Sequence, residues 1–255
     1  MSGFFTPTFA PGTEIAGHLV LAVTSGDGPT VRLRARDSRG RGSEVAVSVR
    51  PGADEAALAD ARHHAQRLAG LDGPVFCVPT DIRLTDHGLV VIRPWFESTL
   101  ALGARAAGLS ARRCIGLVID LARALDEAHH CGLRHGAVGG TNIVIADDGR
   151  GRLVDAAATC APVSDDTVAL GAAATNWLGE FDEGPLVDLA REQCAAAARG
   201  RLGASELADR LDRVMNADQP RPDPPQASAP PPRRHADQPR RVGLQPWGWL
   251  RSRRR

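Results

Sequence analysis

Apolar and polar positions alternate along the first 50 residues in a pattern that predicts β-strands. Apolar runs cover residues 19–23 and 31–35, and the turn-forming sequence Ser-Gly-Asp-Gly-Pro lies between them. The second run alternates apolar residues with arginine, which is typical of a strand with one solvated face. A third run covers residues 45–49 and ends before a Pro-Gly pair. We therefore expect three strands here, with Arg32 and Arg34 facing water.

Farther along the chain the apolar spacing becomes helical. Apolar residues recur every three or four positions within residues 53–71, which predicts a helix. Two short β-runs follow, at residues 75–79 and 89–93. A long helix is then predicted to begin at Ser110, because serine caps helix N-termini well, and to end near Gly132.

The segment after this long helix combines one hairpin with three helices. Short apolar runs at residues 143–145 and 152–154 flank an Asp-Asp-Gly sequence, which indicates a hairpin. Helices are predicted at about residues 165–178, 185–198 and 204–215. A β-rich part with one helix, followed by a helical part with one hairpin, predicts an α+β fold.

Composition changes sharply near Met215. Residues 216–255 hold two proline-rich stretches and nine arginines against three aspartates, a net charge of +6. Such a segment buries too little apolar surface to offset its ordering entropy, so we expect a disordered tail. The preceding 215 residues carry 22 arginines against 27 acidic residues, a net charge of −5. The total of +1 therefore combines an acidic body with a basic tail.

The 255-residue chain contains no lysine, and all 31 of its basic residues are arginine. This absence excludes a Walker A loop, a Schiff-base nucleophile and a lysine general base. No apolar run reaches about 18 residues and no basic-plus-apolar leader is present, so these signals predict neither a membrane span nor export. Five widely spaced cysteines without a CxxC pair predict a reducing, cytoplasmic environment.

Five motifs occur together in an order and spacing that match a known family. They are Gly26-Asp27-Gly28, Val45-Ala46-Val47-Ser48, the loop over residues 133–143 with His135 and Asn142, Val154-Asp155-Ala156-Ala157, and residues 166–171 with the sequence Asp-Thr-Val-Ala-Leu-Gly. They resemble the Gly-rich loop, the V-A-I-K strand, the H-R-D catalytic loop, the D-F-G aspartate and a central helix. Over about residues 11–213, the chain resembles the eukaryotic-like Ser/Thr protein kinases of bacteria, especially those of actinobacteria.

The resemblance implies a protein-kinase-like two-lobe fold. A β-rich N-lobe would cover residues 13–93 after an N-terminal extension over residues 1–12. A reduced helical C-lobe would cover residues 94–215, and the disordered tail would follow over residues 216–255. The positions that match the family's nucleotide-binding residues are Gly26, Gly28, Ala46, Ile92 and Trp95.

The chain departs from the family's pattern at the catalytic positions. Ser48 replaces the lysine that holds the nucleotide phosphates, and Arg32 or Arg34 is the alternative cation for them. His64, or His63 in a register shifted by one residue, stands in place of the glutamate partner. Ala137 replaces the catalytic aspartate, and alanine cannot accept a proton. Asn142 and Asp155 match the residues that hold the family's Mg²⁺ ions.

These losses predict a pseudokinase, a catalytically inactive kinase-like module that acts as a scaffold or regulatory binding domain and needs no cofactor. Its partner would be a true kinase or a phosphopeptide-reading domain such as a forkhead-associated domain. Thr159, Ser164 and Thr167 are the candidate phosphorylation sites, because a phosphate there would add the charge that such a reader binds. The alternative is a degenerate kinase with residual Mg-ATP binding or atypical phosphotransfer.

The tail carries a separate hypothesis. Aromatic and basic residues gather at its end: Trp247, Trp249, Arg251, Arg253, Arg254 and Arg255. Such a cluster could lie on an anionic membrane surface, which would place the protein at the inner face of the membrane. Nucleic acid binding would use the same charge and is not favoured.

Overall fold

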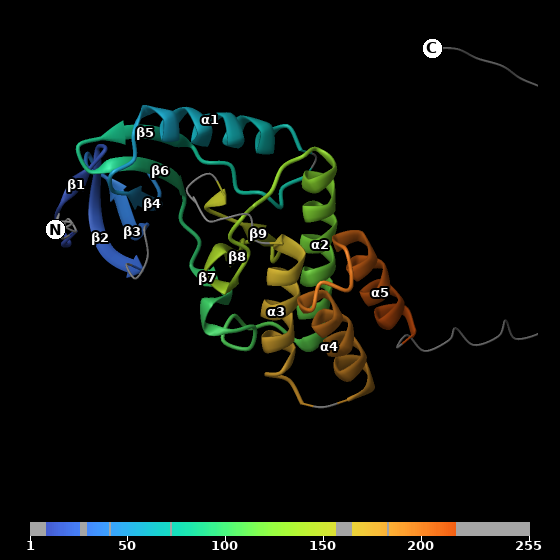
Figure 1. Ribbon diagram of the computed structural model, residues 1–255. Coiled ribbons are helices and arrows are strands. Elements are labelled where there is room, and N and C mark those ends of the chain that lie inside the picture. The colour runs from blue at the N-terminus through green and yellow to red at the C-terminus, as the bar shows by residue number, and fades with distance from the viewer. Residues whose placement is uncertain are drawn as a thin grey trace, which may run out of the picture. The chain divides into compact units, whose positions relative to one another are not determined.

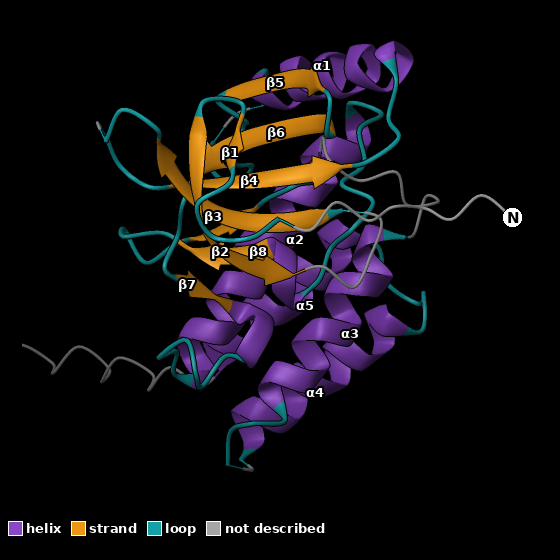
Figure 2. Cartoon of the chain, turned by 90° about the vertical axis from the view of Figure 1, so that its left-hand side faces the viewer, coloured by secondary structure: helices purple, strands orange, loops and turns teal. Residues whose placement is uncertain are grey.

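The computed structural model describes residues 9–25, 30–40, 42–71, 73–156, 165–182 and 184–217, with only the backbone described at Ser25 and Leu102. These residues form a mixed α+β structure in which a curled antiparallel sheet is combined with five α-helices (Figures 1 and 2). This confirms the α+β class that the apolar pattern predicts. The predicted tail, from its third residue onward, lies outside the described residues.

Two sheets hold the nine strands found among the described residues. The strands are β1 (Glu14–Ile15), β2 (His18–Ser25), β3 (Val31–Asp37), β4 (Val45–Arg50), β5 (Asp81–Thr85), β6 (Gly88–Pro94), β7 (Ser98–Thr99), β8 (Ile143–Ile145) and β9 (Gly151–Leu153). The first six form one antiparallel sheet in the order β1-β2-β3-β4-β6-β5, and the last three form the order β7-β8-β9.

Most helices lie in the second half of the described chain. The α-helices are α1 (Glu55–Ala69), α2 (Ala111–His130), α3 (Asp166–Leu178), α4 (Pro185–Ala198) and α5 (Ala204–Ala217), and two short 3-10 helices are η1 (Leu100–Leu102) and η2 (Gly140–Asn142). Ser110 caps α2 as predicted, since its side chain accepts a hydrogen bond from the backbone N–H of Arg113.

The six-stranded sheet is buried on both faces along β6, where six of the seven residues are buried. Leu89 and Val91 pack in one apolar cluster with Leu58 of α1, whereas Val90 and Ile92 pack in another with residues of β3 and β4. This split follows from the two-residue period of a strand. Helix α1 lies against β5, as Figure 1 also shows.

The helical part is built around α2, which packs against α3, α5 and β9. Ten of its 20 residues are buried, so it is the centre of the largest apolar cluster. Helices α3 and α4 approach closely at Gly171. A Cβ there would lie 2.6 Å from the backbone nitrogen of Ala198 and 2.7 Å from the carbonyl oxygen of Cys194. The close packing of these helices therefore depends on glycine at this position.

The prediction of a strand over residues 75–79 was wrong. Phe76 makes only an isolated bridge with Leu153 of β9, supported by hydrogen bonds from Cys77 N–H to the carbonyl of Leu153 and from Leu153 N–H to the carbonyl of Val75. Pro79 lacks the N–H that a longer ladder would need, and the strand that pairs with β6 begins at Asp81.

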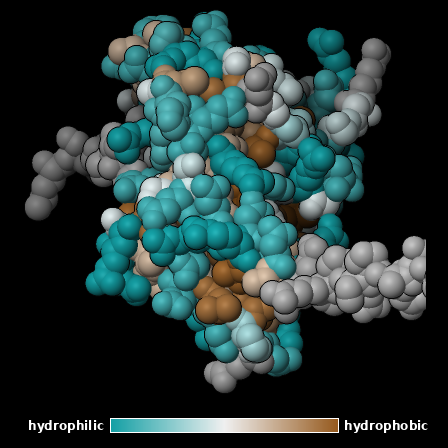
Figure 3. Space-filling view, turned by 90° about the vertical axis from the view of Figure 1, so that its right-hand side faces the viewer, coloured by the Kyte–Doolittle hydropathy of each residue, from teal (hydrophilic) through white to brown (hydrophobic). Residues whose placement is uncertain are grey.

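Few large apolar side chains stand exposed on the described surface. Val23 and Leu189 are the large apolar side chains that stand exposed on it, and the face drawn in Figure 3 is mainly hydrophilic. Among the helices of the described segments, α2 is the longest at 20 residues, and none combines the length and hydropathy of a membrane span.

Candidate functional site: a carboxylate held by two arginines

Asp155, at the position that resembles the family's D-F-G aspartate, follows β9 in an unusual backbone conformation. Its φ of +65° lies in the left-handed region, which costs about 1–3 kcal/mol for a residue other than glycine. Its side chain is only 1% exposed. Such a conformation persists when surrounding contacts determine it, and here the contacts come from side chains of the six-stranded sheet.

Three strands supply those side chains on one face of the sheet. In the antiparallel register Arg32 of β3 lies opposite Ser48 of β4, while Ala46 lies opposite Arg93 of β6. Residues directly opposite one another share a face, as do residues two apart along a strand. Arg32, Ser48 and Arg93 therefore project from the same face, toward Asp155.

The two oxygens of Asp155 accept four hydrogen bonds from this face. Oδ2 accepts from Nε of Arg32 at 2.9 Å and lies 3.5 Å from Nη2 of Arg93. Oδ1 accepts from Nε of Arg93 at 3.0 Å and from the hydroxyl of Ser48 at 3.2 Å. Two guanidinium groups thus meet one carboxylate in a site where the Arg93 side chain is 7% exposed and that of Arg32 is 20% exposed.

The expectation that Arg32 lies on a solvated face was wrong. Its Nη2 also donates to Oδ1 of Asn142 at 2.6 Å, so the side chain spans from β3 to η2. The apolar–arginine alternation did identify a strand with two different faces. It could not show that the arginine face at Arg32 is covered by another part of the chain. Arg34 does lie toward the surface, where it pairs with Glu44 and Glu97.

Asn142 and Asp155 are neighbours because of the β8–β9 hairpin. The ladder extends one step beyond the strands, with Val154 N–H donating to the carbonyl of Asn142 at 2.9 Å. The Asn142 amide is oriented at both ends, since Nδ2 donates to the carbonyl of Ala137 at 2.7 Å. The positions that match a catalytic aspartate and two Mg²⁺ ligands therefore do lie together.

Opposing effects act on the ionisation of Asp155. Burial alone would raise the pKa of its carboxyl, but the charge and hydrogen bond of Arg93, the charge of Arg32 and the hydroxyl of Ser48 together hold that pKa below its ordinary value of 3.8. The group is therefore a carboxylate at neutral pH.

This arrangement does not fit the Mg²⁺ ion that the family resemblance implies. A hard divalent cation needs free oxygen ligands. Both oxygens of Asp155 and Oδ1 of Asn142 already accept hydrogen bonds from arginine, and a metal ion there would meet the charge of two guanidinium groups. In the described part of the chain, no group of three or more His, Cys, Asp and Glu residues is placed to hold a metal.

A second buried carboxylate, Asp166, holds the loop that resembles the catalytic loop. It begins α3 and is fully buried. Its Oδ2 accepts from the N–H of His135 at 2.9 Å, its Oδ1 accepts from the N–H of Gly136 at 2.8 Å, and Nε2 of His129 lies 3.0 Å from Oδ2. The carboxylate thereby joins the ends of α2 and α3 to this loop.

The hydrogen bonds of His135 define its tautomer. Nε2 must donate to the carbonyl of Val154, 2.9 Å away, while Nδ1 must accept from the N–H of Ala137 at 3.3 Å. Burial lowers the pKa of His135, against the opposing charge of Asp166 and the bond to Val154. The imidazole is therefore neutral and structural, which is the role that a buried histidine with two satisfied nitrogens can fill.

His64, at the position of the family's glutamate, lies on α1. Its Nε2 is buried and has no hydrogen-bond partner among the described residues. Burial, followed by the charges of Arg67 and His63, lowers the pKa of His64. A neutral imidazole here cannot form the ion pair that a glutamate would form with a cation.

The predicted nucleotide-binding residues do not all face the same side. Ala46 shares the face of Ser48 and Arg93, but Ile92 lies opposite Val47 and packs in the apolar cluster on the other face. Ile92 therefore lies on the face away from Asp155, and Arg93 takes the position toward it, while the nucleotide-binding role of these residues stays a prediction. Trp95 lies beneath the Arg34 guanidinium, whose carbon is 5.1 Å from the ring centroid.

The structure says less about the predicted phosphorylation sites, the Gly-rich turn and the tail. Thr167 is 3% exposed, which argues against its phosphorylation in the folded protein. Residues of the Gly-rich turn, the activation segment and the tail fall outside the described residues: Gly26, Gly28, Thr159, Ser164, Trp247, Trp249, Arg251, Arg253, Arg254 and Arg255. The hypotheses on these residues stay predictions.

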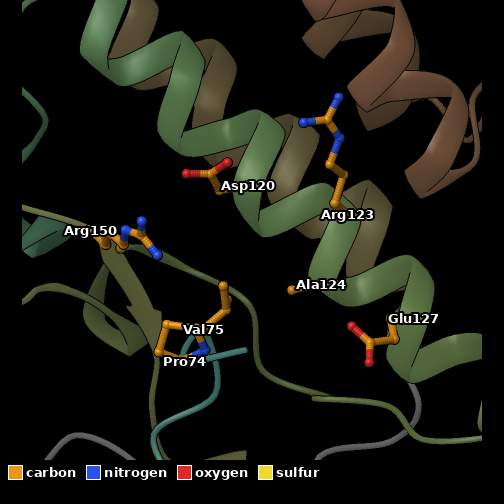
Figure 4. Close-up of a pocket in the computed structure, with 8 residues that line it drawn as sticks. Pro74, Val75, Asp120, Arg123, Ala124, Glu127 and Arg150 are labelled. Carbon is orange, nitrogen blue, oxygen red and sulfur yellow. The ribbon is translucent and has the colours of Figure 1, made fainter. Parts of the chain in front are cut away.

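A cavity of about 330 Å³ lies away from Asp155, between α2 and the start of β9 (Figure 4). Asp120, Arg123 and Glu127 line it from α2, and Arg150 lies across from them. Its two acidic and two basic side chains balance, so its lining selects no charge. Arg123 is also paired with Asp212 of α5.

In comparisons with known proteins, neither a protein-family model nor a curated protein matches the chain.

Proposed function

We propose that the chain is a catalytically inactive protein-kinase-like module, with a β-rich N-lobe over residues 13–93 and a reduced helical C-lobe over residues 94–215. The gathering of the motif positions supports this proposal. Ser48 lies 107 residues from Asp155 in the sequence, yet its hydroxyl donates to that carboxylate. Arg32 joins Asp155 to Asn142, and the Asn142 amide donates to the carbonyl of Ala137.

One observation carries the functional part of the proposal: arginines of the protein itself bind the oxygens that Mg-ATP would need. Phosphoryl transfer depends on positioning and on cations that neutralise the phosphates. Here Arg32 and Arg93 direct their charge to Asp155, and the methyl group of Ala137 cannot accept a proton from a substrate hydroxyl.

A module of this kind works by recognition. We propose a protein partner that reads a phosphorylated residue in the short segment between Asp155 and Asp166, where Thr159 and Ser164 are the candidates. The partner would be a phosphopeptide-reading domain, and a true kinase would add the phosphate. The cysteine pattern favours a cytoplasmic setting for this exchange.

Two assays test the proposal on the full chain. In the first, γ-labelled ATP with Mg²⁺ is supplied to the protein alone and with a generic protein substrate, beside an active bacterial Ser/Thr kinase as a positive control. We expect no labelled protein, and no shift in melting temperature at millimolar Mg-ATP beyond the shift that the same concentration of inorganic phosphate causes. Label transfer that disappears in Asp155→Asn would overturn the proposal in favour of a degenerate kinase.

The second assay concerns the partner. The chain is phosphorylated in vitro by the active kinase and then presented to a purified forkhead-associated domain. We expect binding only after phosphorylation, and loss of binding in the double variant Thr159→Ala with Ser164→Ala. Equal binding by the unphosphorylated chain, or by the double variant, would contradict a phosphate-dependent partner.

A further inference from the structure

A small cavity lies beside the two arginines that hold Asp155. Its volume is about 100 Å³. This is room for about three water molecules, or for one ion of the size of phosphate. It is well below the roughly 300–1,000 Å³ of pockets that enclose a drug-sized ligand such as a nucleoside. The residues that line it are Thr24, Arg32, Arg93, Trp95, Phe96, Thr99, Ala101, Thr141 and Val144.

Among the described residues, the charges around this cavity do not balance. Two guanidinium groups line it, and Asp155 supplies one negative charge to both of them. Glu44 and Glu97, the next acidic groups along the sheet, pair with Arg34, which does not line the cavity. Because Arg93 and Arg32 are largely removed from water, the excess positive charge is poorly screened.

Hydrogen-bond donors also remain available there. Arg32 uses Nε and Nη2 for Asp155 and Asn142, and its Nη1 has no acceptor among the described residues. Nε1 of Trp95 is buried and has no partner in the described part of the chain, although a buried indole N–H ordinarily finds one. Thr24, Thr99 and Thr141 line the same space, although the Thr24 hydroxyl already donates to the carbonyl of Arg32 at 3.1 Å.

We propose that this cavity binds one small tetrahedral oxyanion, namely a phosphate group. An anion would neutralise the excess charge of the arginine pair and would also accept a hydrogen bond from the unpartnered indole N–H. A neutral ligand could accept that hydrogen bond but would leave the charge uncompensated. The source is either free inorganic phosphate or the phosphate of a larger ligand whose remainder stays outside. The proposal is independent of the proposed function, because it needs only the cavity and its donors.

The test is a titration of the full chain with inorganic phosphate at constant ionic strength in an anion-poor buffer, followed by calorimetry and by ³¹P line broadening. We expect saturable binding to the wild-type chain. Arg32→Gln should weaken it about tenfold, the factor expected for a lost charge-assisted hydrogen bond. Trp95→Phe removes the indole N–H but keeps an aromatic ring, and should weaken binding by a smaller factor while preserving the fold.

Arg36→Gln is the matched control, because it removes one positive charge from the same strand at an exposed residue that does not line the cavity. It should bind phosphate as the wild type does. No binding by the wild type, or equal weakening in Arg32→Gln and Arg36→Gln, would overturn the proposal. In a second arm, Mg-free ATP competes with phosphate. Competition at similar affinity identifies a phosphate group as the shared feature, whereas ATP binding far tighter than phosphate would overturn the size argument.

Discussion

Two buried carboxylates in this protein are held by different kinds of hydrogen-bond donor. Asp155 is bound by the charged side chains of Arg32 and Arg93, which come from strands more than 60 residues away in the sequence. Asp166 is bound by backbone N–H groups of His135 and Gly136, about 30 residues away, with His129 beside them. Both side chains are almost completely removed from water.

The difference separates two functions of a buried charge. Backbone donors hold a loop in place without adding a compensating ion, so Asp166 organises the loop over residues 135–137. Arginine side chains bring charge of their own, so Asp155 links the sheet to the helical part through an ion pair. A buried ion pair adds little net stability compared with apolar packing, but loss of one partner is costly. The two sites should therefore respond differently to the same substitution.

The largest effect is expected at Asp155. Asp155→Asn keeps the size of the side chain but leaves two poorly hydrated guanidinium groups without a counter-charge. We expect the free energy of unfolding to fall by about 3–5 kcal/mol, measured by urea denaturation. Asp148→Asn is the control, because Asp148 pairs with Arg152 at a more exposed site and its loss should cost much less. Equal losses in the two variants would refute the description of Asp155 as a buried ion pair.

A smaller effect is expected at Asp166. Asp166→Asn replaces one of two acceptor oxygens by a donor, so one backbone N–H of the loop loses its partner. We expect a loss of about 1.5–3 kcal/mol, with faster hydrogen exchange at the amides of His135 and Gly136. The neighbouring Asp165→Asn should be nearly neutral, since asparagine caps a helix as well as aspartate does. If Asp166→Asn cost more than Asp155→Asn, the comparison between the two sites would be reversed.

The smallest effect concerns pH. Burial lowers the pKa of His135 below 6.5, so the unfolded chain binds a proton that the folded chain does not as pH falls through 6.5. The stability from this group is fully present above pH 6.5 and declines below it. Asp155, whose pKa lies below 3.8, contributes no change in that range.

Urea midpoints at pH 7.5 and 5.5 distinguish these two contributions. We expect His135→Gln to reduce the loss of stability between the two pH values. Asp155→Asn should leave the size of that loss unchanged, although it lowers stability at both. An unaltered loss in His135→Gln would show that the pH dependence arises elsewhere.

Local sequence signals predicted the elements well, because the signals and the structures are both local. Ser110 caps α2 where the pattern placed it, and an Asp-Asp-Gly sequence joins β8 to β9. The apolar run over residues 75–79 did not form a strand, because Pro79 lacks an N–H and Phe76 forms only an isolated bridge with Leu153 of β9.

The site was predicted only in part. The resemblance selected Ser48, Asn142 and Asp155. The Ser48 hydroxyl donates directly to Asp155, and Arg32 donates to both Asp155 and Asn142. Arg32 was misjudged because strand alternation shows that two faces differ, not what covers each of them. Arg93 was missed, although a charged residue at the end of an otherwise apolar strand is a usable signal. A buried charge requires a partner, and Asp155 is that partner.

The choice of arginine at both positions makes the link between sheet and helices permanent under physiological conditions. A guanidinium group does not lose its proton at any pH a cell reaches, and acylation, which neutralises lysine side chains, has no lysine to act on in this chain. Asp155 stays ionised over the same range. Neither acidity nor lysine acylation can therefore break this ion pair.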